Sequence, residues 1–489
     1  MNLLVNLLGQ RKLILASVLL LGIVGLDAWL NMDRQEDPAF PYRYGFVTVQ
    51  FPGADVDQVE RLVIDPLEQE LAQVEFVDEL RTTVRAGFGL VIVVMQQDVY
   101  DTATAWERVR IATDLAAQRF PAEAQAPEVD DRIIDAATVV YALTGSNDQV
   151  QMQDAAERLR DHLLSVPGVA RIRLFGHGDE QVTIAYEDAT AQTLGISPTQ
   201  LAEQIQGSNR IVPAGYVQAA RRQLQIRPRT DLDSIDELGR LAITLPDGNT
   251  LPLASIADVS LTAAEPARET AWFNGERAVA VAVVAQNDVL NVEQFGRDLS
   301  DKVERLRTQF APLAIEEMFY QPQHVHERLQ ELGQNLLLGV AIVVSILLLV
   351  MGLRLGLLVG LMVPLVTLTA LAIYSLGGGV LQQMAVAGMV IALGMLVDNA
   401  IVMSENIQWH IDRGKPRPQA ARHSVRELLA PLGAATGTTV AVFLPMVLAS
   451  GDTADFTRAV PTMIILMLII SYVYAVMVTP IMATWLLKD

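Results

Sequence analysis

Residues 388–406, GMVIALGMLVDNAIVMSEN, place an acidic residue, Asp398, in the middle of a stretch that is otherwise apolar. A membrane helix needs about 20 mostly apolar residues to cross about 30 Å of hydrocarbon. An ionised carboxylate at the centre of such a helix costs about 2.5–3.5 kcal/mol on insertion scales, so it must be paired, protonated or facing a watery cavity. This stretch therefore predicts a membrane protein and also indicates where its chemistry lies.

Other stretches of the chain meet the same length requirement. The expected spans are Leu13–Leu30, Asn335–Met351, Leu355–Leu376, Ala385–Ile407, Leu432–Ala449 and Val460–Leu487. The first span follows basic residues, as the apolar part of a signal peptide does. Its length and the lack of a small-x-small cleavage site favour an uncleaved anchor. We therefore expect a bundle of six transmembrane helices.

Basic residues gather on one side of these spans. Bacterial membrane proteins keep Lys and Arg preferentially on the cytoplasmic side. Both termini are therefore expected in the cytoplasm, and the long segment after the first span is expected on the outer side. The basic residues are Arg11, Lys12, Arg354, Arg413, Lys415, Arg417, Arg422, Arg426 and Lys488, five of them in the loop expected between the fourth and fifth spans.

The segment between the first two spans is strongly acidic. Residues 32–330 hold 47 Asp and Glu against 26 Lys and Arg, whereas the rest of the chain holds 9 acidic and 10 basic residues. Such acidity argues against nucleic acid as a partner, because phosphate binding needs a basic face. The chain has no cysteine, which excludes disulfides, cysteine nucleophiles and thiolate metal sites.

No constellation typical of an enzyme, a nucleotide-binding loop or a metal site stands out in the sequence. His324 and His326 are separated by one residue, but we interpret them as surface residues because no further ligands cluster with them. We therefore expect a protein that is not an enzyme and that binds no metal and no cofactor.

The acidic segment shows two sets of strand and helix patterns in β-α-β-β-α-β order, which is typical of ferredoxin-like subdomains. In the first set, strand 44–51 ends at Pro52-Gly53, and Asp55 is placed to cap the helix that follows. Its further elements are strands 75–85 and 88–95 and helix 101–119; the second set has strands 137–144, 169–175, 278–286 and 313–320 and helices 150–165 and 290–309.

These patterns predict an α+β membrane protein with two ferredoxin-like periplasmic subdomains, the second interrupted by a β-rich, docking-type insert. The expected turns of the insert lie at Gly195, 213–215 and 246–249. The domains are residues 1–31 for the first transmembrane helix, 32–130 for the first subdomain, 131–175 with 278–330 for the second, 176–277 for the insert, and 331–489 for helices two to six.

The fourth span carries its polar residues on one helical face. The residues at steps of three and four are Ala387, Ile391, Gly394, Asp398, Val402 and Glu405. Small residues such as Gly388 and Gly394 let another helix approach closely, so we expect this face to point into the bundle.

Asp398 is the expected proton carrier, because a moving cation can alternately load and unload a buried carboxylate. A permanently paired Asp that only holds helices together is the structural alternative. Asn399 is a polar neighbour that serves either the relay or helix packing. Glu405 and Asn406 are possible accessory polar residues, although a solvated place near the cytoplasmic end is the simpler interpretation.

The sequence resembles the resistance–nodulation–division (RND) exporters, in particular their hydrophobe/amphiphile efflux (acriflavin-resistance-like) branch. The resemblance covers nearly the whole chain, and the motif of the fourth span is its most specific part. It is carried by Phe51-Pro-Gly-Ala-Asp55, Val166-Pro-Gly-Val169, Leu174-Phe-Gly176, Gly394-x-x-Val-Asp-Asn-Ala-Ile-Val-x-x-Glu-Asn406 and Val478-Thr-Pro480.

The resemblance implies a pump of the bacterial inner membrane that lets protons in while trimers cycle their porter subdomains. Its cargo, an amphiphilic small molecule, is expected to leave through a periplasmic adaptor and an outer-membrane channel. Asp398 matches the family's proton-translocating Asp, and Asn399 stands where a second Asp is common. Phe175 matches an aromatic residue of the substrate pocket, with a core Phe at a strand end as the alternative.

Members of this family carry the whole plan twice, and the relay's lysine and hydroxyl partners come from the second half. The resemblance therefore implies an N-terminal half that a second chain completes, or a truncated product. The arm of the insert around Gln218–Leu224 is shorter than usual in the family. Two other functions stay open from the sequence: a subunit of a SecD/SecF-like protein-export motor, and a truncated scaffold that does not transport.

Overall fold

The structure, a computed structural model, describes all residues except 1–10, 39–40, 132–135, 179, 187, 209–215, 220–221, 226–233, 265–266, 268, 287–290 and 488–489. The turn expected at 213–215 and the basic residue Lys488 lie outside the described residues. The chain divides into two compact units, which are described separately below. One comprises residues 1–138, 285–297 and 320–489, and the other comprises 139–284 and 298–319.

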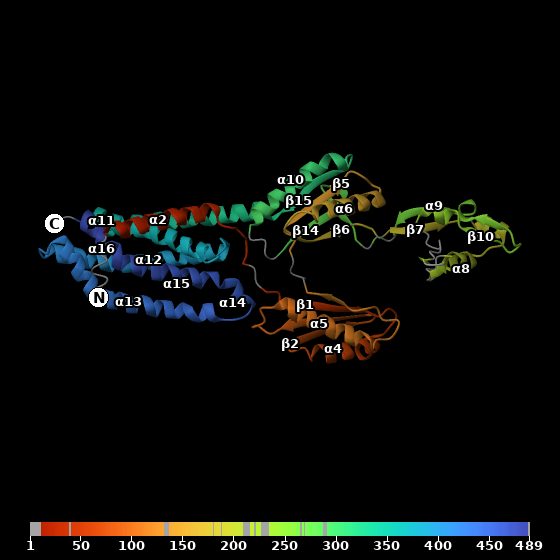
Figure 1. The fold of residues 1–489 in the computed structure, drawn as a ribbon, viewed down its shortest axis with the longest axis horizontal. Coiled ribbons are helices and arrows are strands. Elements are labelled where there is room, and N and C mark those ends of the chain that lie inside the picture. Colours follow the sequence, from red (N-terminus) through yellow and green to blue (C-terminus); the bar gives the residue numbers. More distant parts are fainter. Residues whose placement is uncertain are drawn as a thin grey trace. The chain divides into compact units, whose positions relative to one another are not determined.

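The first unit contains the apolar helices (Figure 1). Among the described residues, five helices are long and apolar enough to cross a membrane. They are α2 (Arg11–Asn31), α11 (Gln321–Leu376), α12 (Gln383–Asp412), α13 (Arg417–Leu448) and α15 (Ala459–Met477).

Helix α11 contains both the second and the third expected span, and it is interrupted between them. Gly352 has φ 78° and ψ 169°, a left-handed conformation that glycine adopts without the penalty of a Cβ atom. A Cβ at Gly360 would lie 3.1 Å from Val344, sixteen positions earlier. In a continuous helix those residues would be about 24 Å apart, so the chain reverses direction at Gly352. The two arms lie side by side, as the two expected spans would.

The connection between the fourth and fifth expected spans is shorter than the sequence analysis predicts. Helix α12 ends at Asp412 and α13 begins at Arg417, with Pro418 in its first turn, where proline is favoured. Arg417, Arg422 and Arg426 therefore lie on a helix, and the prediction of a long basic loop is wrong. The cause is an amphipathic pattern in this charged stretch, where Ala420, Ala421, Ser424 and Val425 are buried.

The last expected span is also divided. Helix α15 ends at Met477, and a short helix α16 (Thr479–Leu486) follows with Pro480 in its first turn. Proline has no N–H to donate to the preceding turn, which accounts for the change of helix at this point. A short helix α14 (Asp452–Thr457) precedes α15 and occupies the loop expected between the fifth and sixth spans.

The first unit also holds an α/β subdomain with a four-stranded antiparallel sheet in the order β2-β3-β1-β4. Its elements follow one another in β-α-β-β-α-β order. They are β1 (Tyr44–Gln50), α3 (Val56–Val59), η1 (Glu60–Ile64), α4 (Asp65–Leu71), β2 (Val77–Arg85), β3 (Phe88–Met95), α5 (Thr102–Ala117) and β4 (Glu128–Asp130).

The predicted helix cap at Asp55 is confirmed. The Asp55 carboxylate accepts a hydrogen bond from the Gln58 backbone N–H at 2.8 Å, and the Gln58 side chain accepts one from the Asp55 N–H at 3.1 Å. This reciprocal pair is a capping box. Among the apolar residues that follow the cap, Val59 and Val63 are fully buried, whereas Leu62 is 37% exposed. The segment Glu60–Ile64 is a π-helical turn, whose wider winding changes which residues face the core.

The second unit contains a sheet in which β5 and β6 pair with β14, and β15 pairs with β5. The same β-α-β-β-α-β order recurs across the insert. Its elements are β5 (Val139–Thr144), α6 (Gln149–Leu163), β6 (Val169–Phe175), β14 (Glu276–Ala285), α10 (Val292–Phe310) and β15 (Ala314–Tyr320).

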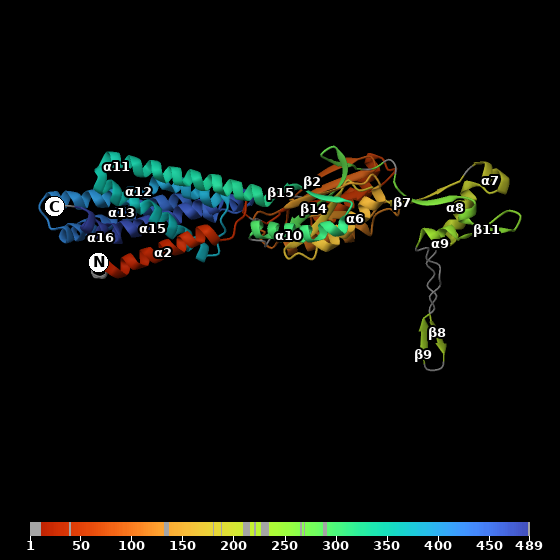
Figure 2. The ribbon, with the colours of Figure 1, turned by 90° about the horizontal axis from the view of Figure 1, so that it is seen from above.

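The insert between β6 and β14 is more helical than expected. Its helices form where the sequence has good caps: the Ser197 hydroxyl accepts from the Gln200 N–H, and the Gln200 side chain accepts from the Ser197 N–H at 3.0 Å. The insert thus contains the expected strands together with helices that the sequence analysis did not predict, and its strands form two-stranded ladders and an edge strand. The hairpin β8–β9 is one of those ladders (Figure 2). The elements are β7 (Glu180–Ala185), α7 (Asp188–Leu194), α8 (Pro198–Ser208), β8 (Tyr216–Ala219), β9 (Arg222–Gln225), α9 (Ile235–Gly239), β10 (Ala242–Thr244), β11 (Thr250–Pro252), η2 (Leu253–Ser255), β12 (Asp258–Ala263) and β13 (Ala271–Phe273).

Candidate functional site

Helix α12, which carries Asp398, is held by close contact with α15. A Cβ at Gly388 would lie 2.7 Å from the carbonyl oxygen of Val460 and 3.0 Å from the Cβ of Met463. Glycine is thus the residue that allows the two backbones to approach this closely. Helices α11 and α13 also pack against α12.

The face of α12 that carries Asp398 is not covered by the other described helices of this chain. Asp398 is exposed in this chain, and it forms no hydrogen bond or ion pair with any of the described residues. Its neighbours on the same face are exposed as well, with Ile391 at 53% and Val402 at 41%, and a Cβ at Gly394 would meet no atom within 4 Å. Within the part of the chain that the structure describes, the expected burial of this face is therefore wrong, because α11, α13 and α15 cover the other faces of α12.

Gly388 and Gly394 are consequently expected to respond differently to the same substitution. Gly388→Val forces a branched side chain into the α12–α15 contact, and such overpacking costs about 1–3 kcal/mol of unfolding free energy. Gly394→Val points into open space and should change it by less than about 0.5 kcal/mol. Thermal unfolding of the detergent-solubilised chain measures both values. Equal effects would contradict the close contact at Gly388.

Asn399, next to Asp398, faces the bundle. It is 7% exposed and lies between two hydroxyl groups of neighbouring helices. Its amide Nδ2 donates to Ser471 Oγ at 3.5 Å, and Thr436 Oγ1 donates to its Oδ1 at 3.4 Å. These bonds are long and therefore weak, but they link α12 to both α13 and α15. Ser471 in turn donates to the Leu396 carbonyl at 2.7 Å.

The sequence analysis missed Thr436 and Ser471 as partners of Asn399. Each is a polar residue inside an apolar span, and that signal marks a place where a membrane helix needs a hydrogen-bonding partner. Glu405 is exposed in this chain, and Asn406 is half-buried with its Oδ1 lacking a hydrogen-bond partner among the described residues. Neither contacts Asp398 through a hydrogen bond in the described part of the chain.

A second polar cluster, also missed by the sequence analysis, surrounds Arg43 at the start of β1. The Arg43 side chain is fully buried; its Nη1 lies 2.6 Å from Asp452 Oδ1 and its Nη2 lies 2.8 Å from Asp455 Oδ2. Its Nε donates to the Val99 carbonyl at 3.0 Å, and its guanidinium lies 5.3 Å from the centroid of the Tyr100 ring. Desolvation by burial would lower the pKa of Arg43, but the hydrogen bonds to Asp452 and Asp455 raise it, so the guanidinium stays charged.

The Arg43 cluster joins the first α/β subdomain to the short helix between α13 and α15. Asp452 and Asp455 lie in the first turn of α14, where acidic side chains are favoured by the helix dipole. Arg458 also contacts Asp455 at 2.6 Å. This joint lies within one compact unit and connects the subdomain directly to the apolar helices.

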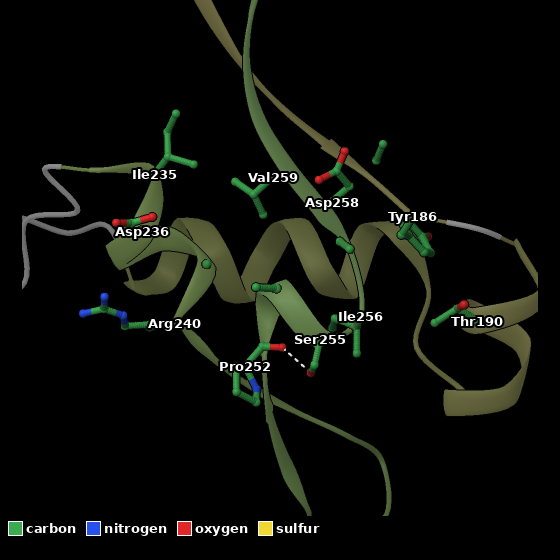
Figure 3. A pocket seen from close by; sticks show the side chains of 14 residues that line it. Tyr186, Thr190, Ile235, Asp236, Arg240, Pro252, Ser255, Ile256, Asp258 and Val259 are labelled. Atoms are coloured by element: carbon green, nitrogen blue, oxygen red, sulfur yellow. Dashed lines mark hydrogen bonds between the residues drawn. The ribbon is translucent and has the colours of Figure 1, made fainter.

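Phe175, the expected pocket aromatic, lies at the end of β6. It is half-buried, and the Arg173 guanidinium lies 5.0 Å from its ring centroid. A cavity of about 860 Å³ lies instead in the insert, between β7, α9, η2 and β12, where Tyr186, Arg240 and Asp258 are among its lining residues (Figure 3). Phe175 lines neither this cavity nor one of about 580 Å³ beside Trp272.

Several helices long and apolar enough to cross a membrane, together with the α/β units, are features of a membrane protein. The chain belongs to the AcrB/AcrD/AcrF family, whose sequence profile matches residues 7–489. The predicted resemblance to RND exporters is thereby confirmed.

Individual relatives support the same assignment at low identity. Multidrug resistance protein MdtF of Escherichia coli O157:H7 is 26% identical over 457 residues, which cover 90% of this chain and 44% of MdtF. MdtC of Pantoea ananatis is 25% identical over 90% of this chain and 43% of its own length. An uncharacterized transporter of Haemophilus influenzae is 24% identical over 98% of this chain and 47% of its own length. The chain thus spans less than half the length of these relatives.

Proposed function

We propose that this chain supplies the N-terminal half of a proton-driven RND pump that exports amphiphilic small molecules. The observation that carries this proposal is the uncovered face of Asp398. A carboxylate that faces lipid without a partner is costly, so a further set of helices must cover this face. A second half, whether in the same polypeptide or another, would provide those helices and a cation for Asp398.

In this proposal Asp398 exchanges one proton per cycle. When the cation of the second half approaches, the ionised carboxylate is stabilised; when it withdraws, Asp398 takes up a proton from the outer side. Moving one charge across 100 mV releases about 2.3 kcal/mol. Asn399 cannot carry a proton in this way, because an amide does not titrate. Its hydrogen bonds to Thr436 and Ser471 instead favour a role in tying α12 to its neighbours.

The surrounding architecture is proposed to follow the family. The reversal at Gly352 supports six spans, because it turns α11 into two adjacent arms. The β-α-β-β-α-β order of both α/β units supports ferredoxin-like porter subdomains in the periplasm. The basic residues near Arg354 and Arg413 support a cytoplasmic location for both termini.

The partners and the cargo are proposed from the resemblance. We expect a trimer that contacts a periplasmic adaptor and an outer-membrane channel, with the cargo passing near Phe175. The names of the relatives favour drug export over the motor of protein export, and they favour a transporter over an enzyme. A scaffold that does not transport would keep its function when Asp398 is replaced by Asn, whereas a proton-driven pump would lose it.

Photo-crosslinking tests the proposed second half. Benzoylphenylalanine in place of Val402, on the uncovered face, should crosslink to helices that lie outside residues 1–489, and mass spectrometry identifies the joined peptides. Met403 is fully buried within this chain, so the same replacement there should crosslink only within it. Crosslinks from position 402 to lipid alone, in the assembled transporter, would contradict the proposal.

A further inference from the structure

Three potential metal ligands meet where α12 ends and α13 begins. His410 Nε2 lies 3.0 Å from Glu427 Oε2, and His423 Nε2 lies 3.2 Å from Glu427 Oε1. One ligand atom from each residue falls within 4.8 Å of the others. The two imidazole rings stand edge-on, with centroids 4.8 Å apart.

Local structure explains why these three side chains converge. His423 and Glu427 are four positions apart on α13 and therefore lie on one face of that helix. His410 is in the last turn of α12, and the chain reverses in the short connection 413–416, where Gly414 has φ 81°. The His410 carbonyl accepts a hydrogen bond from the Lys415 N–H at 3.1 Å, which holds this turn closed.

The burial of the three residues suits a metal site in which one ligand is buried and fixed while the other two are open to solvent. The His410 side chain is 2% exposed and its ring packs against Trp409, with centroids 4.8 Å apart. His423 and Glu427 are 51% and 45% exposed, so an ion can reach them from solvent. One ligand is thus positioned by packing, and the other two can adjust to the ion.

Two imidazole nitrogens and one carboxylate oxygen are a ligand set that Zn²⁺ prefers. Tetrahedral ligands at about 2.0–2.2 Å from Zn²⁺ are about 3.3–3.6 Å apart. The distances of 3.0 and 3.2 Å run to different oxygens of Glu427, and one ligand atom from each residue lies within 4.8 Å of the others. Rotation of the half-exposed His423 and Glu427 side chains would bring the three ligand atoms to this geometry. We propose that His410, His423 and Glu427 bind one Zn²⁺ ion that joins α12 to α13, with solvent in the fourth position. This site departs from the expectation, drawn from the sequence, that the protein binds no metal.

Lys415 competes with the ion. Its Nζ lies 3.1 Å from His410 Nδ1, so the ammonium group donates to Nδ1, and Nε2 carries the proton that it donates to Glu427. Metal binding needs a free lone pair on Nε2. The proton therefore moves from Nε2 to Nδ1, and Lys415 turns away toward solvent. Removal of the ammonium group should consequently strengthen the binding of Zn²⁺.

Metal titration of the full chain in detergent, after removal of any affinity tag, tests this inference. Calorimetry with Zn²⁺ should show one ion per chain with a Kd of about 10 µM or tighter, weaker than structural sites with four ligands. Co²⁺ should give the visible absorption of a tetrahedral complex. His423→Ala and Glu427→Gln should each weaken binding by at least about 10-fold. These positions are half-exposed, so the variants should fold, and gel filtration checks that they do.

Two further variants serve as matched controls. Lys415→Gln should bind Zn²⁺ more tightly than the unsubstituted chain, because the competing ammonium is gone. The double variant His324→Ala, His326→Ala removes two histidines at a distant place in the chain and should leave the Kd unchanged. Absence of saturable binding, or an unchanged Kd in His423→Ala, would overturn the site, as would weaker binding in Lys415→Gln.

Discussion

Replacing Asp398 by Asn is expected to lower cargo export by the assembled transporter to the background of cells that lack it, a loss on the order of 10²-fold or more. This magnitude is what a single proton-transferring group typically contributes. Asn has nearly the shape of Asp, but its side-chain amide does not bind or release a proton at physiological pH. Export of an amphiphilic dye from energised cells measures the effect.

The matched control for this variant is Glu405→Gln, the same change of carboxylate to amide on the same face of α12. Glu405 is exposed and is not expected to exchange the transported proton, so export should stay close to that of the unsubstituted protein. Asp398→Asn should also leave the melting temperature of this chain unchanged, since Asp398 has no hydrogen bond or ion pair within the described residues. Export at the normal rate by Asp398→Asn would mean that this residue is not the proton carrier.

Replacing Arg43 by Ala is expected to destabilise the chain by about 3–5 kcal/mol, which is the range observed when one member of a buried ion pair is removed. The variant leaves Asp455, whose side chain is only 5% exposed, without its buried cationic partner, and it deprives the Val99 carbonyl of a donor. Unfolding of the purified protein by denaturant measures the free energy. The connection between the first α/β subdomain and α14 should loosen at the same time, so proteolysis of this region should become faster.

Two controls distinguish the effect of losing the buried Arg43 network from the effect of losing an exposed ion pair. Arg81→Ala removes an exposed pair with Glu79 and should lower the free energy of unfolding far less than Arg43→Ala does. Arg43→Met combined with Asp452→Asn and Asp455→Asn should recover part of the lost stability, because it leaves no buried charge unpaired. A stability of Arg43→Ala equal to that of the unsubstituted protein would contradict the structural role of this network.

Local sequence patterns predicted most elements of this fold. The alternation in β1, the cap at Asp55 and the apolar runs of α2 and α12 are properties of consecutive residues, and each corresponds to an element in the structure. The helical start of α13 was missed because its charged residues resemble a loop, although Ala420 and Val425 keep the spacing of a buried helical face.

The arrangement of the candidate site was only partly predictable. Helical periodicity shows that Gly394, Asp398 and Val402 share a face, but it does not show which faces of α12 the other helices of the chain cover. The buried pairing of Arg43 with Asp452 joins residues 409 positions apart, and no local signal points to it. The meeting of His410 with Glu427 likewise depends on how α12 and α13 are joined.

Proton movement in proteoliposomes is the most direct measurement of the role given to Asp398. The assembled transporter is reconstituted with a pH-sensitive dye inside the vesicles, cargo is added, and the change of internal pH is followed under a fixed membrane potential. We expect cargo-dependent proton flux in the unsubstituted protein and in Glu405→Gln, and none in Asp398→Asn. Cargo-dependent proton flux of normal size in Asp398→Asn would show that protons cross by another route.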